Sequence, residues 1–136
     1  MSNAQNLAYA VVQVLHNFGA VATVGGSLAA TRIEDAGVRK KLAWLVIIGW
    51  GTQAVSGAAF GLVSFLYYHK FPDIAGVAFA ALAIKILCAA LGFMLVAVYL
   101  LRGVNWPEKN QSRVWSSSAM LAAIALSAAA FLRWFS

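Results

Sequence analysis

The sequence has little charge for its length. Ten Lys or Arg and four Asp or Glu make up 10% of its 136 residues, whereas hydrophobic residues make up 62%. An ordinary soluble domain has roughly 25% charged residues and about 45–50% apolar ones, and a soluble globule of this size cannot hide so many apolar side chains. The composition therefore excludes a soluble enzyme, a nucleic-acid-binding domain and a disordered segment. It predicts one integral membrane domain over residues 1–136, whose partner is the lipid bilayer and not a nucleic acid.

Cysteine and the common catalytic motifs are scarce too. The single cysteine, Cys88, excludes a disulfide within the chain and a Cys-x-x-Cys metal site. The chain has no P-loop, HExxH or GxSxG motif and no paired carboxylates within an apolar run, so nothing in it indicates an NTPase or a hydrolase. We expect no catalytic residue of the chain's own, and any enzymatic activity would come through a bound cofactor.

Four long apolar runs account for most of the chain. They cover residues 7–31, 42–68, 74–101 and 114–135. Each is long enough for a membrane-spanning helix, which needs roughly 20 apolar residues, and none has the charged outer face of a helix in a soluble bundle. Pro72 and Pro107 mark turns in two of the connections. The predicted fold is an all-α, polytopic transmembrane four-helix bundle.

Basic residues gather in alternate connections. The connections at 32–41 and 102–113 hold seven of them, whereas the two ends of the chain and the connection at 69–73 hold two. Because cytoplasmic connections carry the excess of Lys and Arg, we expect the first and third connections in the cytoplasm and both termini outside, in a bacterial-type inner membrane. The first run follows no basic segment and is too long for the apolar part of a signal peptide, so we expect it to be a retained span.

Polar and small residues recur at helical spacing in the first run. They are Gln13, His16, Asn17, Ala20, Thr23 and Ser27. Because these positions share one helix face and an unpaired polar group is costly in hydrocarbon, this face is expected to point into the bundle. In the second run, Gly57 and Gly61 form a G-x-x-x-G pair. Close packing within the bundle is the favoured interpretation of this pair, and a dimer seam is the alternative.

Lys85 lies in the middle of the third run, and no span contains an acidic residue to neutralise it. A central Lys costs about 2.5–3.5 kcal/mol on insertion scales, and such residues usually mark a site. A helical rise of about 1.5 Å per residue brings Lys85 and His16 to similar depths near the midplane. The same estimate brings four further polar side chains near them: Asn17, Gln53, Ser56 and Ser127. We predict that these residues form one buried ligand-binding site.

The chemistry of Lys85 and His16 has several interpretations. Lys85 is a neutral amine, the partner of a bound anion, a donor to His16, Gln53 or a ligand carbonyl, or a structural lysine satisfied by helix backbone. His16 is a hydrogen-bonded packing residue, a proton-handling group, or a ligand of a metal or haem. A haem held by two histidines of one chain is disfavoured because His69, the only other histidine, lies at the membrane edge. For copper, the soft partner of His16 would be Cys88, one turn from Lys85.

Three stretches also resemble a known family. LHNFGAVATVGGSLAA places His16 nine residues before Gly25 and Gly26, SGAAFGL lies in the second run, and AIKILCAALGFMLVAVYLLR carries Lys85 and ends on Arg102. With these motifs the chain resembles the copper-resistance-D-like family of four-helix membrane proteins, over residues 16–102. The resemblance implies a link to copper uptake or tolerance, and for some relatives a link to haem b or quinone.

Three functions follow as expectations. The first is a small copper- or redox-related membrane protein with a buried mid-membrane polar site, with copper held by His16 and Cys88. The second is an accessory subunit of a larger membrane complex, or a homo-oligomer, without chemistry of its own. The third is a quinone- or haem-binding electron-transfer protein, in which Lys85 and His16 contact the ligand.

Overall fold

The computed structural model describes residues 2–70 and 73–135, and over these residues it contains helices and no strand. The helices are α1 (Asn3–Ala30), α2 (Ala36–Tyr68), α3 (Gly76–Arg102) and α4 (Glu108–Phe135), with a short 3-10 turn, η1 (Gly103–Asn105), between the last two. All four long helices have the length and apolar composition needed to cross a membrane. The predicted all-α bundle of four spans is therefore confirmed. The turn expected at Pro72 lies outside the described residues.

At one end of the bundle the helices start earlier than the apolar runs suggest. α2 begins at Ala36 and α4 at Glu108, so most of the two basic connections is helical rather than loop. Asp35 caps α2 by accepting the backbone N–H of Val38 at 2.7 Å. Pro107 directly precedes α4, and its carbonyl accepts the backbone N–H groups of Asn110 and Gln111. The helices extend beyond the predicted spans here because apolarity marks only the part of a helix in hydrocarbon, whereas capping decides where the helix begins.

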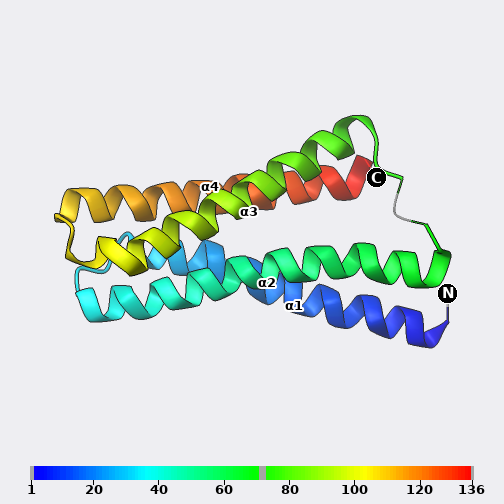
Figure 1. The fold of residues 1–136 in the computed structure, drawn as a ribbon, viewed down its shortest axis with the longest axis horizontal. Coiled ribbons are helices and arrows are strands. Elements are labelled where there is room, and N and C mark those ends of the chain that lie inside the picture. Colours follow the sequence, from blue (N-terminus) through cyan, green and yellow to red (C-terminus); the bar gives the residue numbers. More distant parts are fainter. Residues whose placement is uncertain (1, 71–72, 136) are drawn as a thin grey trace.

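The helices associate as two antiparallel pairs, α1 with α2 and α3 with α4 (Figure 1). The pairs lie closest near the connection between α1 and α2 and near η1, and they diverge toward the end that carries both termini. We call the first end the closed end and the second the open end. α2 also contacts α3, and α1 contacts α4, so the four helices form one ring of neighbours.

Large buried side chains gather in the half of the bundle nearer the closed end. Trp50, Tyr99 and Trp115 are among the largest fully buried residues, and the rings of Tyr99 and Trp115 meet edge to face with centroids 4.9 Å apart. Trp50 packs directly on Gly92, where any Cβ would overlap the indole ring. In the closed half, Trp50 therefore joins the two helix pairs, whereas Tyr99 and Trp115 join α3 to α4 within one pair.

The glycines of α2 do not pack as the sequence suggested. A Cβ on Gly57 or Gly61 would meet no atom within 4 Å, so the favoured interpretation of this pair as close packing within the bundle is wrong. The close approach of α1 and α2 lies instead at Gly19 and Gly49, where a Cβ on Gly49 would come within 2.9 Å of the Ala22 Cβ. A G-x-x-x-G spacing places two glycines on one face but does not determine what that face contacts.

Candidate functional site

Lys85 and His16 meet inside the bundle. The Lys85 Nζ lies 2.9 Å from the His16 Nε2, so this contact joins α3 to α1 across the two helix pairs. His16 is 9% exposed, and Lys85 is half-buried. The structure thus brings together the two residues that the depth estimate placed near the midplane, and we call their contact the centre.

The hydrogen bonds around His16 favour one position for its ring proton. Its Nδ1 lies 2.7 Å from the Ser56 Oγ, and the Ser56 hydroxyl donates to the Thr52 carbonyl at 2.5 Å. Because a serine hydroxyl has one hydrogen, this assignment makes Nδ1 the donor to Ser56. The Nε2 is then the acceptor, and Lys85 donates to it. The network assigns His16 as a neutral imidazole with its proton on Nδ1.

Helix α2 holds His16 in place by three different contacts. Gln53 donates its side-chain N–H to the His16 backbone carbonyl, Ser56 accepts from the ring as described, and Phe60 meets the ring edge-on with centroids 5.8 Å apart. The three residues occupy one face of α2, since they are spaced by three and four positions. Only the Nε2 side of the imidazole is left to face Lys85, so α2 positions His16 for that contact.

Lys85 has more hydrogen-bond donors than the described residues use. A lysine ammonium has three donors, and the hydrogen bond found for Lys85 within the described residues is the one to His16. The four acidic residues of the chain lie at positions 34, 35, 73 and 108, near the helix ends and away from the centre. The centre therefore offers donors without a carboxylate to occupy them, which suits a ligand with acceptor oxygens.

Two predicted site residues do not join the centre. Asn17 is exposed and accepts a hydrogen bond from Gln13 at 2.7 Å. Ser127 is also exposed and donates to the Ala123 carbonyl of its own helix at 2.9 Å. For Ser127 the prediction is wrong because a depth estimate does not give the direction of a residue around its helix. For Asn17 it is wrong because this residue lies about 100° around α1 from His16, whereas the buried face of α1 follows His16, Thr23 and Ser27.

The two predicted copper ligands, His16 and Cys88, have other surroundings in the structure. Both ring nitrogens of His16 are hydrogen-bonded, and Cys88 is buried in the hydrophobic core cluster. Within residues 2–70 and 73–135, no three His, Cys, Asp or Glu side chains gather in a way that would hold a metal ion. A metal on His16 would have to displace Lys85 or Ser56 from the ring.

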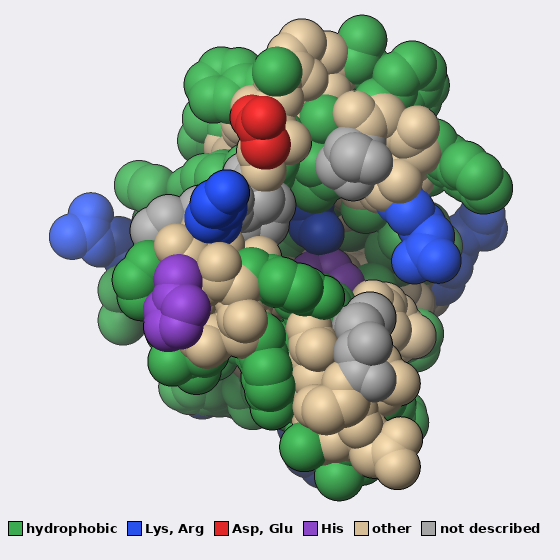
Figure 2. Space-filling model, turned by 90° about the vertical axis from the view of Figure 1, so that its right-hand side faces the viewer, with side chains coloured by type: hydrophobic (Ala, Val, Ile, Leu, Met, Phe, Trp, Pro, Cys, Tyr) green, Lys and Arg blue, Asp and Glu red, His purple; other side chains and the backbone are tan. Residues whose placement is uncertain are grey.

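A recess leads from the open end toward the interior. Figure 2 views this end and shows a histidine and a Lys or Arg side chain set deep between the helices, behind the surface residues. On α2, the face that contacts α3 through Trp50 continues through Gly57 and Gly61, seven and eleven residues further on. Neither glycine has a neighbouring helix within reach of a Cβ. We call this space the open-end recess.

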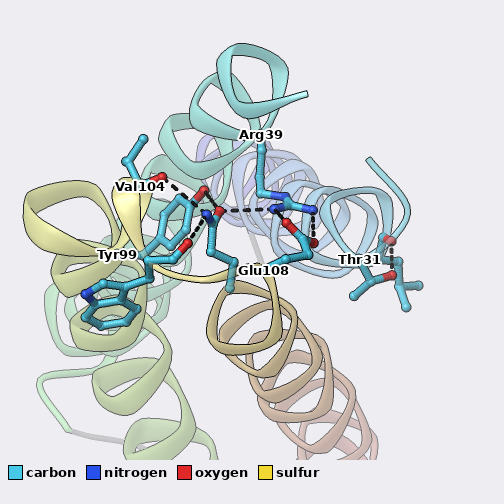
Figure 3. A network of polar contacts seen from close by, with 8 residues as sticks. Thr31, Arg39, Tyr99, Val104 and Glu108 are labelled. Carbon is cyan, nitrogen blue, oxygen red and sulfur yellow. Dashed lines mark hydrogen bonds and ion pairs between the residues drawn. The ribbon is translucent and has the colours of Figure 1, made fainter. Parts of the chain in front are cut away.

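A second polar network ties the helices together at the closed end (Figure 3). Arg39 is 2% exposed and forms a bidentate ion pair with Glu108, with N–O distances of 2.8 and 2.9 Å. It also donates to the Gln111 Oε1 at 3.0 Å, which accepts from the Tyr99 hydroxyl at 2.9 Å as well. The network joins α2, α3 and α4. Its geometry is well defined because the two terminal nitrogens of Arg39 each bond one carboxylate oxygen of Glu108.

This network was not predicted from the sequence, although a signal was available. Arg39 was counted only among the basic residues of the first connection, whereas Glu108 is an acidic residue in the other basic connection at the same end. A further contact at this end was also missed: Ser27 and Ser118 share a buried hydrogen bond of 2.8 Å that joins α1 to α4. Among the described residues, the hydrogen bonds that join the two helix pairs lie at the centre and toward the closed end.

No family model matches the chain, and neither does any curated protein or solved structure. The resemblance to the copper-resistance-D-like family therefore remains an expectation from the motifs around His16 and Lys85.

Proposed function

We propose that this chain is a small redox-related membrane protein that binds a lipid-soluble ligand of the quinone class at the centre. One observation carries the proposal: the Lys85 Nζ lies 2.9 Å from the His16 Nε2 in the middle of four apolar helices. An ionisable residue at this depth is costly and usually serves a site. A donor-rich centre without a carboxylate favours a ligand whose polar atoms are acceptors, as quinone carbonyl oxygens are.

The residues of the centre would have different roles in binding the ligand. Lys85 would donate a hydrogen bond to a ligand oxygen, and His16 would hold the Lys85 amine by accepting one of its hydrogens. Ser56 and Gln53 position His16 and so act through it rather than on the ligand. A bound quinone supplies reversible electron and proton uptake, whereas the chain's own residues bind and orient the headgroup.

Copper and haem b, which the family resemblance favours, have less support. The ring nitrogens of His16 are engaged with Ser56 and Lys85, and Met94 and Met120, two other soft side chains, are exposed on the outside of the bundle. A copper-related role therefore stays a prediction. Metal analysis and a visible absorption spectrum of gently purified protein test it: bound copper or a Soret band would replace the quinone proposal.

An accessory role in a larger membrane complex is the second candidate. Its support is that the described connections outside the helices are short, with residues 31–35 between α1 and α2. Partners that co-purify with the chain, together with loss of the chain when they are deleted, would favour it. A chain that is monodisperse and binds its ligand alone would count against it.

We also propose that the protein lies in a bacterial-type inner membrane with the open end outside. The support is the concentration of basic side chains at the closed end, including Arg39, Lys40, Lys109 and Arg113. Cysteines introduced singly at Ser2 and Ser112, in a Cys88→Ala background, test the orientation. We expect an impermeant thiol reagent to label Ser2→Cys in spheroplasts and Ser112→Cys only in inverted vesicles. The reverse pattern would overturn the orientation.

The binding proposal is tested with a short-chain ubiquinone analogue and the full chain in lipid nanodiscs. Lys85→Met removes the donor but keeps a long apolar side chain, so we expect binding to weaken at least about tenfold, as expected for loss of a hydrogen bond from a charged donor. Lys109→Met, which removes an exposed lysine at the closed end, is the matched control and should bind like the parent. Unchanged binding by Lys85→Met, with helicity retained, would remove the proposal.

A further inference from the structure

We infer that the centre is reached from the open end only, and that the contacts of the closed end form a seal between the centre and the other membrane face. The inference rests on the proposed function only in taking the His16–Lys85 contact as the ligand site. It adds a direction of access, which the identity of the ligand does not determine.

The seal consists of contacts that cross between the two helix pairs. Ser27 and Ser118 join α1 to α4 by a buried hydrogen bond, and Arg39 joins α2 to α4 through Glu108 and Gln111. Large side chains are buried in the same half, among them Trp50, Tyr99 and Trp115. A ligand or water molecule that approached from the closed end would have to displace both the ion pair and the aromatic core.

Among the described residues, no comparable barrier closes the path from the open end. The buried side chains of this half include three alanines, Ala78, Ala81 and Ala128, and a Cβ added to Gly57 or Gly61 on α2 would meet no atom within 4 Å. Lys85 is half-buried rather than sealed, and Figure 2 shows Lys or Arg and His side chains visible from this end. Access from one side therefore follows from how the two halves are packed.

The polar character of the seal suggests that it can open. An aromatic core alone would close the path permanently, whereas the Arg39–Glu108 pair lies at the membrane edge with Glu108 exposed to solvent. Loss of this pair leaves the Arg39 guanidinium buried without its carboxylate, which favours entry of water. We therefore expect the ion pair to control whether the closed half admits solvent.

Thiol accessibility tests the inference without any ligand. Single cysteines are introduced in a Cys88→Ala background at Lys85 on the recess floor, at Gly57 on its wall and at Ser118 in the seal. Ser2→Cys marks the open end and Ser112→Cys the closed end. A charged, impermeant methanethiosulfonate is applied to spheroplasts and to inverted vesicles, and each labelling rate is compared with those of the two markers.

Lys85→Cys and Gly57→Cys should react at least about tenfold faster from the side on which Ser2→Cys reacts, because labelling follows the population of open states. Ser118→Cys should react from neither side. When Glu108→Ala is added, Ser118→Cys should become reactive from the side of Ser112→Cys.

Three outcomes would overturn the inference. They are equal labelling of Gly57→Cys and Lys85→Cys from both sides, labelling of both by a lipid-soluble maleimide alone, and labelling of Ser118→Cys while Glu108 is intact. Using both Gly57→Cys and Lys85→Cys keeps the test decisive if one variant fails to fold, which circular dichroism and size-exclusion profiles would reveal. One-sided access without quinone binding would reject the proposed function and leave this inference standing.

Discussion

The closed and open halves of the bundle use the same kind of residue, mostly apolar, in opposite ways. The closed half packs Trp50, Tyr99 and Trp115 into a core that crosses between the helix pairs. In the open half, Trp134 is 82% exposed, and the buried side chains include Ala78, Ala81 and Ala128. The centre lies between the tightly packed closed half and the more loosely packed open half.

The difference indicates that stability and access are provided by separate parts of the chain. Binding sites that must exchange ligand are drawn from the less tightly packed parts of a structure. In this protein the closed half supplies the contacts that hold the pairs together, so the open half is free to diverge. The predictions below compare matched residues in the two halves.

The largest effect is expected from truncating a tryptophan of the core. Trp115→Ala removes a fully buried ring that contacts Tyr99, so we expect a loss of about 3 kcal/mol in the free energy of unfolding. Trp134→Ala, in the open half, should change it by less than roughly 0.5 kcal/mol. Reversible unfolding in mixed micelles measures both, and equal losses would contradict the division into two halves.

A smaller effect is expected when side chains are added to glycines. Gly92→Val would force the new side chain into the ring of Trp50, and overpacking of this kind costs about 1–3 kcal/mol. Gly57→Val has open space around it and should leave the midpoint of thermal unfolding nearly unchanged. If Gly57→Val were the more damaging variant, the open-end recess would be occupied, for example by a second copy of the chain.

The smallest effect is expected from removing one hydroxyl. Ser118→Ala breaks the buried bond to Ser27, and interhelical hydrogen bonds in membranes contribute about 0.6 kcal/mol on average. Ser127→Ala removes a hydroxyl that bonds only its own helix and should be neutral. Unfolding of the two variants under identical conditions gives the comparison, and a larger loss for Ser127→Ala would contradict the assignment.

The sequence predicted those features that depend on position along a helix. Four apolar runs gave four helices, and the fixed rise per residue placed Lys85 and His16 at the same depth. Ser56 and Gln53 were placed near them for the same reason. Their convergence could be predicted because distance along a helix axis requires no knowledge of the neighbouring helices.

Features that depend on rotation or on packing between helices could not be predicted. Asn17 and Ser127 have a suitable depth, but both are exposed and their hydrogen bonds are made outside the centre. The pairing of Arg39 with Glu108 joins two connections that are distant in sequence, so it depends on how α2 and α4 are placed side by side. Hydrophobicity gives no information about rotation when a helix is apolar on all sides.

The hydrogen bond between Lys85 and His16 is the central claim, and the nitrogen resonances of His16 test it most directly. Solid-state NMR of the full chain in lipid, labelled with ¹⁵N-histidine and assigned with His69→Gln, reports which ring nitrogen carries a proton. We expect a protonated Nδ1 and an unprotonated Nε2 in the parent, and a shifted Nε2 resonance in Lys85→Met because its donor is gone. A protonated Nε2 in the parent, or an Nε2 resonance that is identical in the two chains, would contradict the contact.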